Sequence, residues 1–298
     1  MCIRDRKAGF IGAGKVGFSL GKYLAKNGID VTGYYSRSAD SAIKASEFTG
    51  TRYYKDLTDI IEDSDTLFIT VPDGAITEVW EYIRNLPIKN KNICHCSGSI
   101  SSAAFFDAEK KGAFRYSIHP LYAFSDRYES YKDLRGAYFS IEGSKARLKE
   151  MTACFAQLGN TVVPIDQEAK ALYHCAAVMA SNHMIALADA AAEMLSSCGF
   201  DQESAVKALT PLMRGNISAI IASGPAAALT GPIERNDLNT VAEHLHALER
   251  ADPQTAELYR FLSSRLIKIA CDKHPNRDYT ELKELLTDER KSLKGERQ

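Results

Sequence analysis

The sequence has almost no net charge, no long hydrophobic run and no recognisable leader, and each of these absences excludes a class of protein. Its 298 residues include 37 Lys and Arg against 38 Asp and Glu, so we expect no binding to nucleic acid or to an anionic membrane. The longest apolar stretches, Cys175–Ala180 and Ile217–Leu229, fall short of the ~20 residues that span a bilayer. Met1–Lys7 is charged, and no apolar segment of signal-peptide length follows it, which favours a cytoplasmic location.

Metal sites and disulfides are not expected either. The seven cysteines are odd in number and scattered through apolar segments, which is typical of reduced, buried thiols in a cytoplasmic protein. Cys94-His95-Cys96 would place its two thiols on one side of a strand and its imidazole on the other. Zinc sites usually have a second pair of ligands at a similar spacing, and the sequence shows no such pair with Cys94-His95-Cys96.

Strand and helix signals alternate through the first part of the chain. Helical patterns at Val16–Lys26, Ser38–Phe48, Ile76–Ile83 and Lys145–Leu158 separate short apolar runs. This alternation predicts an α/β fold, with a Rossmann-like, doubly wound parallel sheet over residues 1–165. The expected strands are Lys7–Ile11, Val31–Tyr35, Tyr53-Tyr54, Thr66–Val71, Asn92–Cys96, Arg115–Ile118, Ala137–Glu142 and Thr161–Ile165.

Strand signals disappear after Asp166, and residues 166–298 are expected to form an all-α domain. Ser223-Gly224-Pro225 and Thr230-Gly231-Pro232 interrupt its helical pattern. A helical domain of this size has too few elements to cover all of its own apolar faces. We therefore expect a homodimer formed through these C-terminal helices. The expected helices are Gln167–Ser197, Gln202–Ile221, Thr240–Leu248, Pro253–Asp272 and Tyr279–Lys294.

Gly12-Ala13-Gly14-Lys15-Val16-Gly17 has the G-x-G-x-x-G spacing of dinucleotide-binding proteins, and it lies between the first expected strand and helix. Gly12 permits a tight turn, Gly14 lets the backbone approach a pyrophosphate, and Gly17 lets helix and strand pack closely. The free amides at the start of the helix would hold the phosphates. The alternative is a glycine turn in an unrelated α/β protein, and the flanking strand and helix favour the cofactor site.

The residues after the second expected strand indicate which cofactor binds. An NAD site normally has Asp or Glu there to bind the ribose 2′-hydroxyl, whereas this chain has Ser36-Arg37-Ser38. A guanidinium and two hydroxyls suit a 2′-phosphate, and no carboxylate repels it. We therefore expect NADP(H), although Arg37 could also be an ordinary exposed loop residue.

Several motifs resemble known families. The N-terminal GFIGAGKVG, YYSRS and ITVPD resemble the 6-phosphogluconate dehydrogenase-like superfamily, which includes NADP oxidoreductases of the F420-dependent type. His119–Ser125, Tyr173–His183 and Ala228–Arg235 are similar to a narrower group, bacterial proteins in which a Rossmann-like domain precedes the domain of unknown function DUF2520. The resemblance covers Lys7 to Leu266 and implies an NADP-dependent oxidoreductase.

The sequence departs from this family at two places. Asn236 stands where the family more often has Gly, and Met1–Arg6 does not look native to the fold.

Ligands of open α/β sheets bind beyond the carboxyl ends of the strands. Val71-Pro72-Asp73 ends one expected strand, and we predict that it lines the cofactor. Ser97 ends the next expected strand, and we predict that it contacts the nicotinamide or the substrate. His119, after the following strand, is the first candidate for protonating or polarising a C=O or C=N group, because histidine titrates near neutral pH. The alternative for Ser97 is that it caps the end of its strand. The alternative for His119 is a structural role, in which its side chain hydrogen-bonds within the turn.

The resemblance adds candidates from the helical domain. Related reductases use a Lys and an Asn of its first helix to bind and protonate substrate, and here His174 and Asn182 are the candidates for these roles, because Lys170 lies a full turn earlier. Burial in a helix core is the alternative for both. The expected substrate-binding residues are Ser125, Thr230 and Arg235, of which Arg235 would bind an anion or else pair with a nearby acid on the surface.

These observations predict hydride transfer between NADPH and a small carbonyl or imine metabolite in a cleft between the two domains. A reductase resembling pyrroline-5-carboxylate or ketopantoate reductase is one alternative. A regulator that binds NADP(H) without catalysis is the other, and Ser97, His119 and Asn182 favour an enzyme over it.

Overall fold

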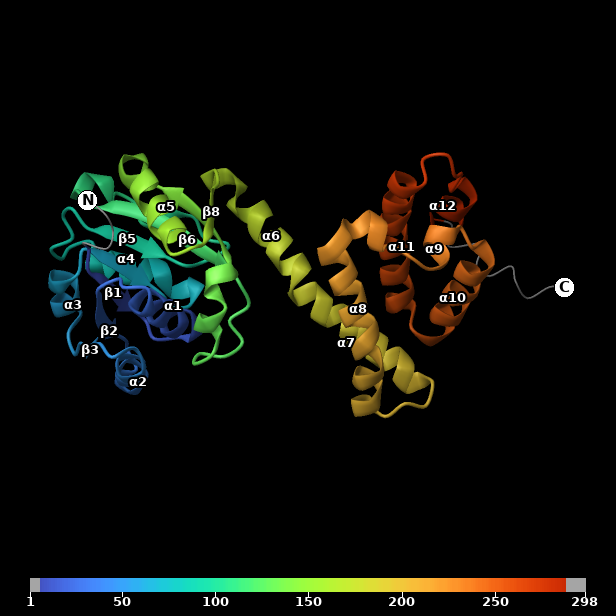
Figure 1. The fold of residues 1–298 in the computed structure, drawn as a ribbon, viewed down its shortest axis with the longest axis horizontal. Coiled ribbons are helices and arrows are strands. Elements are labelled where there is room, and N and C mark those ends of the chain that lie inside the picture. The colour runs from blue at the N-terminus through green and yellow to red at the C-terminus, as the bar shows by residue number, and fades with distance from the viewer. Residues whose placement is uncertain (1–5, 288–298) are drawn as a thin grey trace. The chain divides into compact units, whose positions relative to one another are not determined.

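The computed structural model describes residues 6–287 (Figure 1). Met1–Asp5 and the part of the expected helix Tyr279–Lys294 that follows Thr287 therefore lie outside the described residues. The chain divides into two compact units, Met1–His183 and Met184–Gln298. The domain boundary expected at residue 165 stays a prediction. The helix that follows residue 165 belongs to the first unit by its contacts.

The first unit is built on one sheet, which has eight strands over the described residues in the order β3-β2-β1-β4-β5-β6-β7-β8. All neighbouring strands are parallel except β6 and β7, which are antiparallel. The doubly wound, mainly parallel sheet is therefore confirmed, with a strand near each expected position. The strands are β1 (Ala8–Ile11), β2 (Val31–Tyr35), β3 (Arg52–Tyr53), β4 (Thr66–Ile69), β5 (Asn92–His95), β6 (Phe114–Leu121), β7 (Tyr138–Gly143) and β8 (Thr161–Pro164).

Helices cover both faces of this sheet. Consecutive residues of β4 point to opposite faces, so Phe68 packs against α1, α2 and α5 while Leu67 and Ile69 pack against α3 and α4. Ser38 caps α2 as predicted, because its Oγ accepts the Ser41 N–H at 3.3 Å. The helices are α1 (Lys15–Lys26), α2 (Ala39–Thr49), α3 (Leu57–Asp63), α4 (Ile76–Ile83) and α5 (Leu148–Gln157); the sequence analysis did not predict α3.

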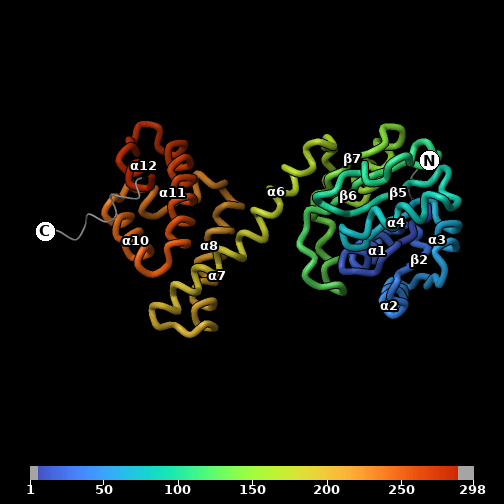
Figure 2. Tube along the Cα trace, turned by 180° about the vertical axis from the view of Figure 1, so that it is seen from behind, coloured from blue at the N-terminus to red at the C-terminus, as the bar shows by residue number. Residues whose placement is uncertain are grey.

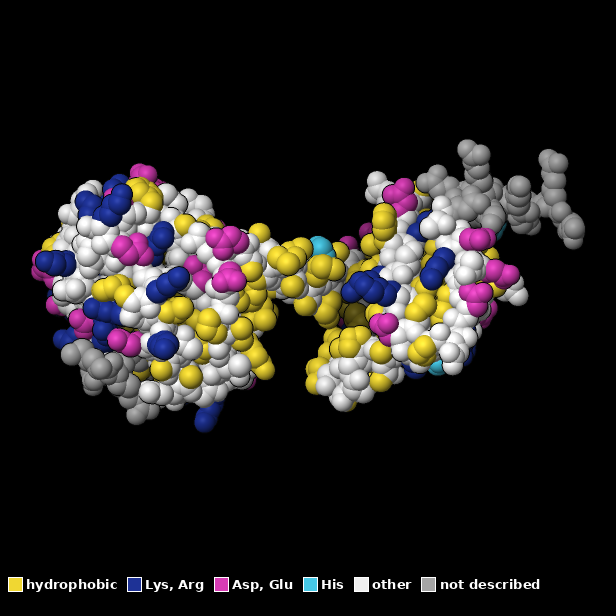
Figure 3. Space-filling view, turned by 90° about the horizontal axis from the view of Figure 1, so that it is seen from above, with side chains coloured by type: hydrophobic (Ala, Val, Ile, Leu, Met, Phe, Trp, Pro, Cys, Tyr) yellow, Lys and Arg dark blue, Asp and Glu magenta, His cyan; other side chains and the backbone are white. Residues whose placement is uncertain are grey.

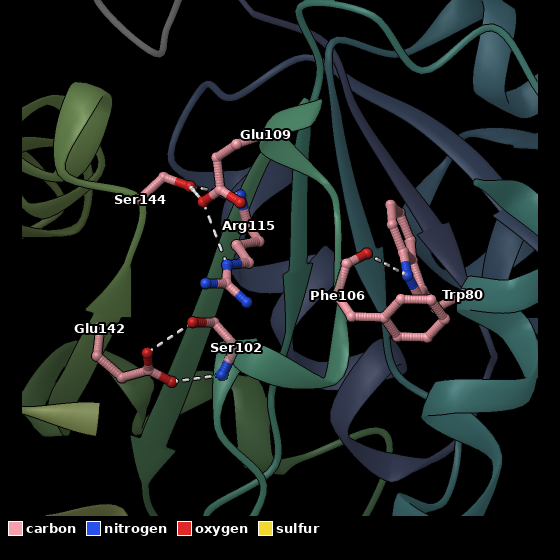
Figure 4. A network of polar contacts seen from close by, with 7 residues as sticks. All are labelled: Trp80, Ser102, Phe106, Glu109, Arg115, Glu142 and Ser144. Carbon is pink, nitrogen blue, oxygen red and sulfur yellow. Dashed lines mark hydrogen bonds and ion pairs between the residues drawn. The ribbon is translucent and has the colours of Figure 1, made fainter. Parts of the chain in front are cut away.

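A polar network fixes the segment between β5 and β6 to the sheet (Figure 4). The buried Glu142 of β7 accepts hydrogen bonds from the backbone N–H and the hydroxyl of Ser102, at 2.6 and 2.7 Å. The indole N–H of Trp80 donates to the Phe106 carbonyl at 3.0 Å. The network thereby holds the loop after β5 in place at the carboxyl edge of the sheet; its other members are Glu109, Arg115 and Ser144.

Helices alone follow β8 over the described residues (Figure 2), which confirms the all-α character of this part. The helical pattern expected over Gln167–Ser197 is confirmed, and Ser181 (φ −125°, ψ −75°) divides it into α6 and α7. Gly224, with φ 79° and ψ 168°, kinks α8. The helices are α6 (Lys170–Ala180), α7 (Asn182–Ser197), α8 (Gln202–Ala228), α9 (Pro232–Arg235), α10 (Leu238–Ala251), α11 (Pro253–Lys273) and α12 (Thr280–Thr287).

The two halves of the helical part differ in burial. Residues of α9 to α12 form a compact core that includes Val241, Leu245 and Ile267, whereas α7 and α8 bury little of their surface. Helix α6 of the first unit also buries little of its surface, and hydrophobic side chains predominate along it in the space-filling view (Figure 3). The expectation that every cysteine is buried is wrong for Cys175 and Cys198, which are exposed on and after these uncovered helices.

The segment Gln167–Ser197 is also long and apolar enough to cross a membrane by length and composition, contrary to the sequence analysis, which considered only uninterrupted apolar runs. One such segment is weak evidence for a membrane protein.

Candidate functional site

The glycine loop between β1 and α1 has the geometry of a phosphate cradle. A Cβ on Gly12, whose φ is +107°, would lie 2.8 Å from the Thr70 backbone, and one on Gly17 would lie 2.6 Å from the Thr70 hydroxyl. A Cβ on Gly14 would meet only the Thr70 carbonyl oxygen, at 3.8 Å, so a ligand can approach the backbone there. No side chain caps the start of α1 and no acid stands in its first turn, which contains Lys15 and Val16. The loop therefore fits a pyrophosphate.

A cavity of about 290 Å³ adjoins this loop. Of the predicted cofactor-binding residues, Gly12, Ala13, Gly14, Ser36, Arg37, Val71 and Pro72 line it. Arg127, which the sequence analysis did not single out, lines it as well. Ser38 does not line it, and its hydroxyl caps α2 instead. The cavity thus joins the glycine loop to the segment predicted to bind a 2′-phosphate.

Asp73 and Ser97 meet where β4 and β5 end. One carboxylate oxygen of Asp73 accepts hydrogen bonds from the hydroxyls of Ser97 (2.8 Å) and Ser99 (2.9 Å). The Ser97 hydroxyl also accepts the N–H groups of Ser99 and Ile100, at 3.2 and 3.0 Å. All these bonds shape the loop itself, so they support the strand-end cap as the role of Ser97, and direct contact with a ligand stays a prediction.

Helix α6 brings Tyr173 and His174 to the end of β6, beside His119. The Tyr173 hydroxyl lies 2.8 Å from His119 Nδ1, and the two rings meet edge to face. Burial lowers the pKa of His119 to about 3, and the nearby Lys170 and His174 act in the same direction. The imidazole is therefore neutral at physiological pH. It can accept or donate one hydrogen bond but cannot act as an imidazolium acid.

Gly98 lets the loop after β5 pass directly beneath these imidazoles. A Cβ there would lie 2.4 Å from His174 Nδ1 and 2.9 Å from His119 Nε2. His174 Nδ1 is buried and has no hydrogen-bond partner among the described residues. A buried polar atom without a partner is uncommon in a protein interior and indicates a place where a ligand or water completes the bonding.

Lys170, at the start of α6, is a further candidate that the sequence analysis set aside. Only 2% of its surface is exposed, and within residues 6–287 its Nζ has no hydrogen-bond partner. Burial lowers its pKa from 10.5 to about 8, while Glu142, Cys96 and Asp73 act against that fall. The signal that could have found it is the spacing of Lys170 and His174, four residues apart and therefore on one face of a helix.

The structure does not bring the remaining first-unit candidates into this cluster. Asn182 is exposed at the start of α7, where its side-chain oxygen accepts the Ser181 hydroxyl at 3.0 Å. Ser125 is exposed in the loop after β6. Their roles stay predictions.

Two candidates, Thr230 and Arg235, belong to the second unit. Arg235 is exposed and lies 3.9 Å from Asp237, which is the surface pairing that the sequence analysis gave as its alternative. Asn236 adopts the left-handed conformation with φ 61°, which explains why glycine suits this position in the family. An anion-binding role for Arg235 stays a prediction.

Comparison with known families agrees with this geometry. Residues 7–93 match the family model described as NADP oxidoreductase coenzyme F420-dependent, and residues 137–266 match DUF2520, a domain of unknown function. The first part of the chain is thus similar to an NADP oxidoreductase domain, and the second part is similar to a DUF2520 domain. The predicted family is therefore confirmed, and the cofactor of this oxidoreductase is NADP(H). No functionally curated protein matches the chain.

Solved structures share the fold of this oxidoreductase. A Thermotoga maritima protein is 28% identical with a TM-score of 0.72, and the match covers 89% of this chain and 99% of that one. A Bacteroides fragilis protein, provisionally described as an NADP oxidoreductase, is 25% identical with a TM-score of 0.70 and the same coverage. Pyrroline carboxylate reductase of Plasmodium falciparum, solved with NADP bound, is 14% identical with a TM-score of 0.60. That match covers 91% of this chain and 97% of the reductase. At 14% identity this last match shows the fold alone.

Proposed function

We propose that the protein uses NADPH to reduce a small carbonyl or imine compound at the cluster of Lys170, His119, Tyr173 and His174. The observation that carries this proposal is Lys170, an almost fully buried lysine whose Nζ has no hydrogen-bond partner among the described residues. The ammonium lies over the Tyr173 ring, 5.6 Å from its centroid, but its N–H groups have no acceptor there. Burying N–H donors without acceptors costs stability, so we propose that a ligand supplies the missing acceptor. The lysine lies among the polar groups at the ends of β5 and β6, where an open α/β sheet binds its ligands.

Lys170 is suited to act as the proton donor. The bound cofactor supplies a hydride to the carbon of C=O or C=N, and the protein has to protonate the oxygen or nitrogen. With a pKa of about 8, the ammonium group is mostly protonated at neutral pH yet gives up its proton more readily than an exposed lysine. Asp73 and Glu142 raise this pKa against the effect of burial, so they keep the proton in place.

His119 and His174 are proposed to orient the substrate. The sequence analysis made His119 the first candidate for protonating or polarising the substrate, and its lowered pKa favours polarising over protonating. Tyr173 holds His119 Nδ1, which leaves Nε2 facing the loop at Gly98. His174 Nδ1 faces the same loop. A substrate held between these nitrogens and Lys170 would have its polar atom fixed next to the donor.

The test is NADPH oxidation with a panel of carbonyl compounds and preformed imines. Lys170→Met should lower kcat ~10²-fold or more, with NADPH affinity nearly unchanged. The rate of the wild-type protein should fall as pH rises through about 8, because the acid loses its proton. Lys149→Met, which removes an exposed lysine of α5, is the matched control. Turnover that survives Lys170→Met would contradict this role, and NADPH binding without turnover of any compound would favour the regulator.

We also propose that the protein is a homodimer that covers α7 and α8. Apolar side chains are exposed along both helices, including Ile185 (70%), Leu212 (63%) and Ile221 (80%). A hollow of about 460 Å³ between the two helices is lined mainly by such residues. Apolar surface of this extent marks interaction sites in water-exposed proteins, and a second copy of the same helices is the partner of matching chemistry.

A further inference from the structure

Arg127 lies in the loop between β6 and β7, 90 residues after Arg37, yet both line the cavity beside the glycine loop. The Ser36 and Ser41 side chains line the same cavity. Neither arginine is in an ion pair within the described part of the chain. The one acidic residue on the cavity wall is Glu78 of α4. Two arginines and two serines therefore line one cavity.

The Arg127 side chain is held in place before any ligand binds. Its guanidinium carbon lies 5.0 Å from the centroid of the Phe18 ring, a cation–π arrangement on a fully buried residue of α1. The Arg127 carbonyl accepts the Ser19 hydroxyl at 3.4 Å, which ties the loop to the same helix. Tyr128 packs edge-on against Phe18 and against Phe48 of α2. The loop is thus anchored on α1 and α2 by its aromatic side chains.

The Arg127 loop also lies beside α2, the helix that follows the Ser36–Ser38 segment, because the neighbouring Tyr128 packs on Phe48 of that helix. Asp40, in the first turn of α2, forms a salt bridge with Lys44 at 2.7 Å.

We propose that Arg127 binds the 2′-phosphate of NADP(H) opposite Arg37 and is a main determinant of the preference for NADPH over NADH. Arg37 is exposed and has to be ordered on binding, whereas Arg127 is half-buried and already stacked. A preorganised guanidinium loses less conformational entropy and can bind a phosphate bidentately. The proposal rests on NADP(H) as the cofactor and is independent of the proposed reduction.

The test compares dissociation constants for NADPH and NADH, measured by the fluorescence of the reduced nicotinamide. Arg127→Met keeps an unbranched apolar stem on Phe18 and removes the charge; it should weaken NADPH ~10- to 100-fold and NADH less than ~3-fold. Competition by 2′,5′-ADP should weaken in parallel, and competition by 5′-AMP should not. Arg52→Met, which removes an exposed arginine paired with Asp63 outside this cavity, controls for lost net charge and should leave both constants unchanged.

Two results would overturn the proposal. Equal weakening of NADPH and NADH by Arg127→Met would move Arg127 to the pyrophosphate or make it a structural residue. No weakening of either cofactor would remove it from the site. Retained NADH affinity and an unchanged unfolding midpoint show that the variant is folded, so a loss confined to NADPH supports the proposal.

Discussion

Replacing Lys170 by methionine should stabilise the protein while it abolishes turnover. Only 2% of the surface of Lys170 is exposed. Methionine has a similar length and carries no charge that would have to be buried. Removal of a buried ammonium group that has no hydrogen-bond acceptor, and whose desolvation outweighs the attraction of Glu142 and Asp73, is expected to raise stability. A gain of stability together with a loss of activity is what a lysine retained for function would show.

The pKa of Lys170 sets the size of the effect. A tenfold change in an equilibrium constant corresponds to about 1.4 kcal/mol, so a fall from 10.5 to about 8 costs the folded state ~3 kcal/mol at neutral pH. The unfolded lysine keeps its proton up to about pH 10.5, whereas the folded one loses it above about pH 8. Wild-type stability relative to Lys170→Met therefore rises between these two values. The advantage of the variant should be ~1 to 3 kcal/mol below pH 8 and should fall by about half near pH 9.5.

Tryptophan fluorescence is the right measurement for this experiment. Trp80 is the one tryptophan of the chain, and it is fully buried in the first unit, which also contains Lys170. Urea unfolding followed at this residue therefore reports on the unit that the substitution affects. The free energy of unfolding is compared at pH 7 and at about pH 9.5 for wild type and variant.

The exposed Lys149→Met serves as the control here too, with no gain expected at either pH. A Lys170→Met variant that is equally or less stable than wild type at pH 7 would show that the interactions of the ammonium group with Tyr173, Glu142 and Asp73 outweigh its desolvation. A gain that does not change with pH would show that packing, and not the charge, is responsible.

Three further predictions concern the cofactor, the loop after β5 and the assembly. Arg37→Ala should weaken NADPH by ~1 to 3 kcal/mol with little effect on NADH, as titration of both cofactors will show, and equal losses would contradict a 2′-phosphate contact. Gly98→Ala should displace the imidazoles of His119 and His174 and lower turnover ~10²-fold with NADPH affinity unchanged, whereas normal kcat would mean that neither ring position matters. Light scattering should give about twice the 32.8 kDa chain mass, and a monomer at micromolar concentration would refute the dimer.

Most of the first unit could be predicted because its signals are local. The burial of β4 on both faces appears in the sequence as a near-continuous apolar run, Thr66–Val71. Gly12 and Gly17 are required by close contacts with Thr70 at the end of β4, yet their spacing after a strand and before a helix is enough to identify the phosphate loop. Ser38 caps its helix through a bond to a residue three positions away. The sequence by itself therefore determined the sheet, the cofactor loop and the family.

Only the tertiary structure decided which residues form the proposed site around Lys170 and that Arg127 joins the cofactor cavity. Lys170 appears in the sequence as one charged residue at the start of an alanine-rich helix, and only the packing of α6 on the strand ends buries it and lowers its pKa. The same burial makes His119 too weak a base to be the acid that its position suggested. Arg127 reaches the cofactor cavity because its loop folds back onto α1, a contact between residues more than a hundred positions apart. Long-range packing sets burial and charge proximity, and for that reason the chemistry of these residues could not be predicted from the sequence.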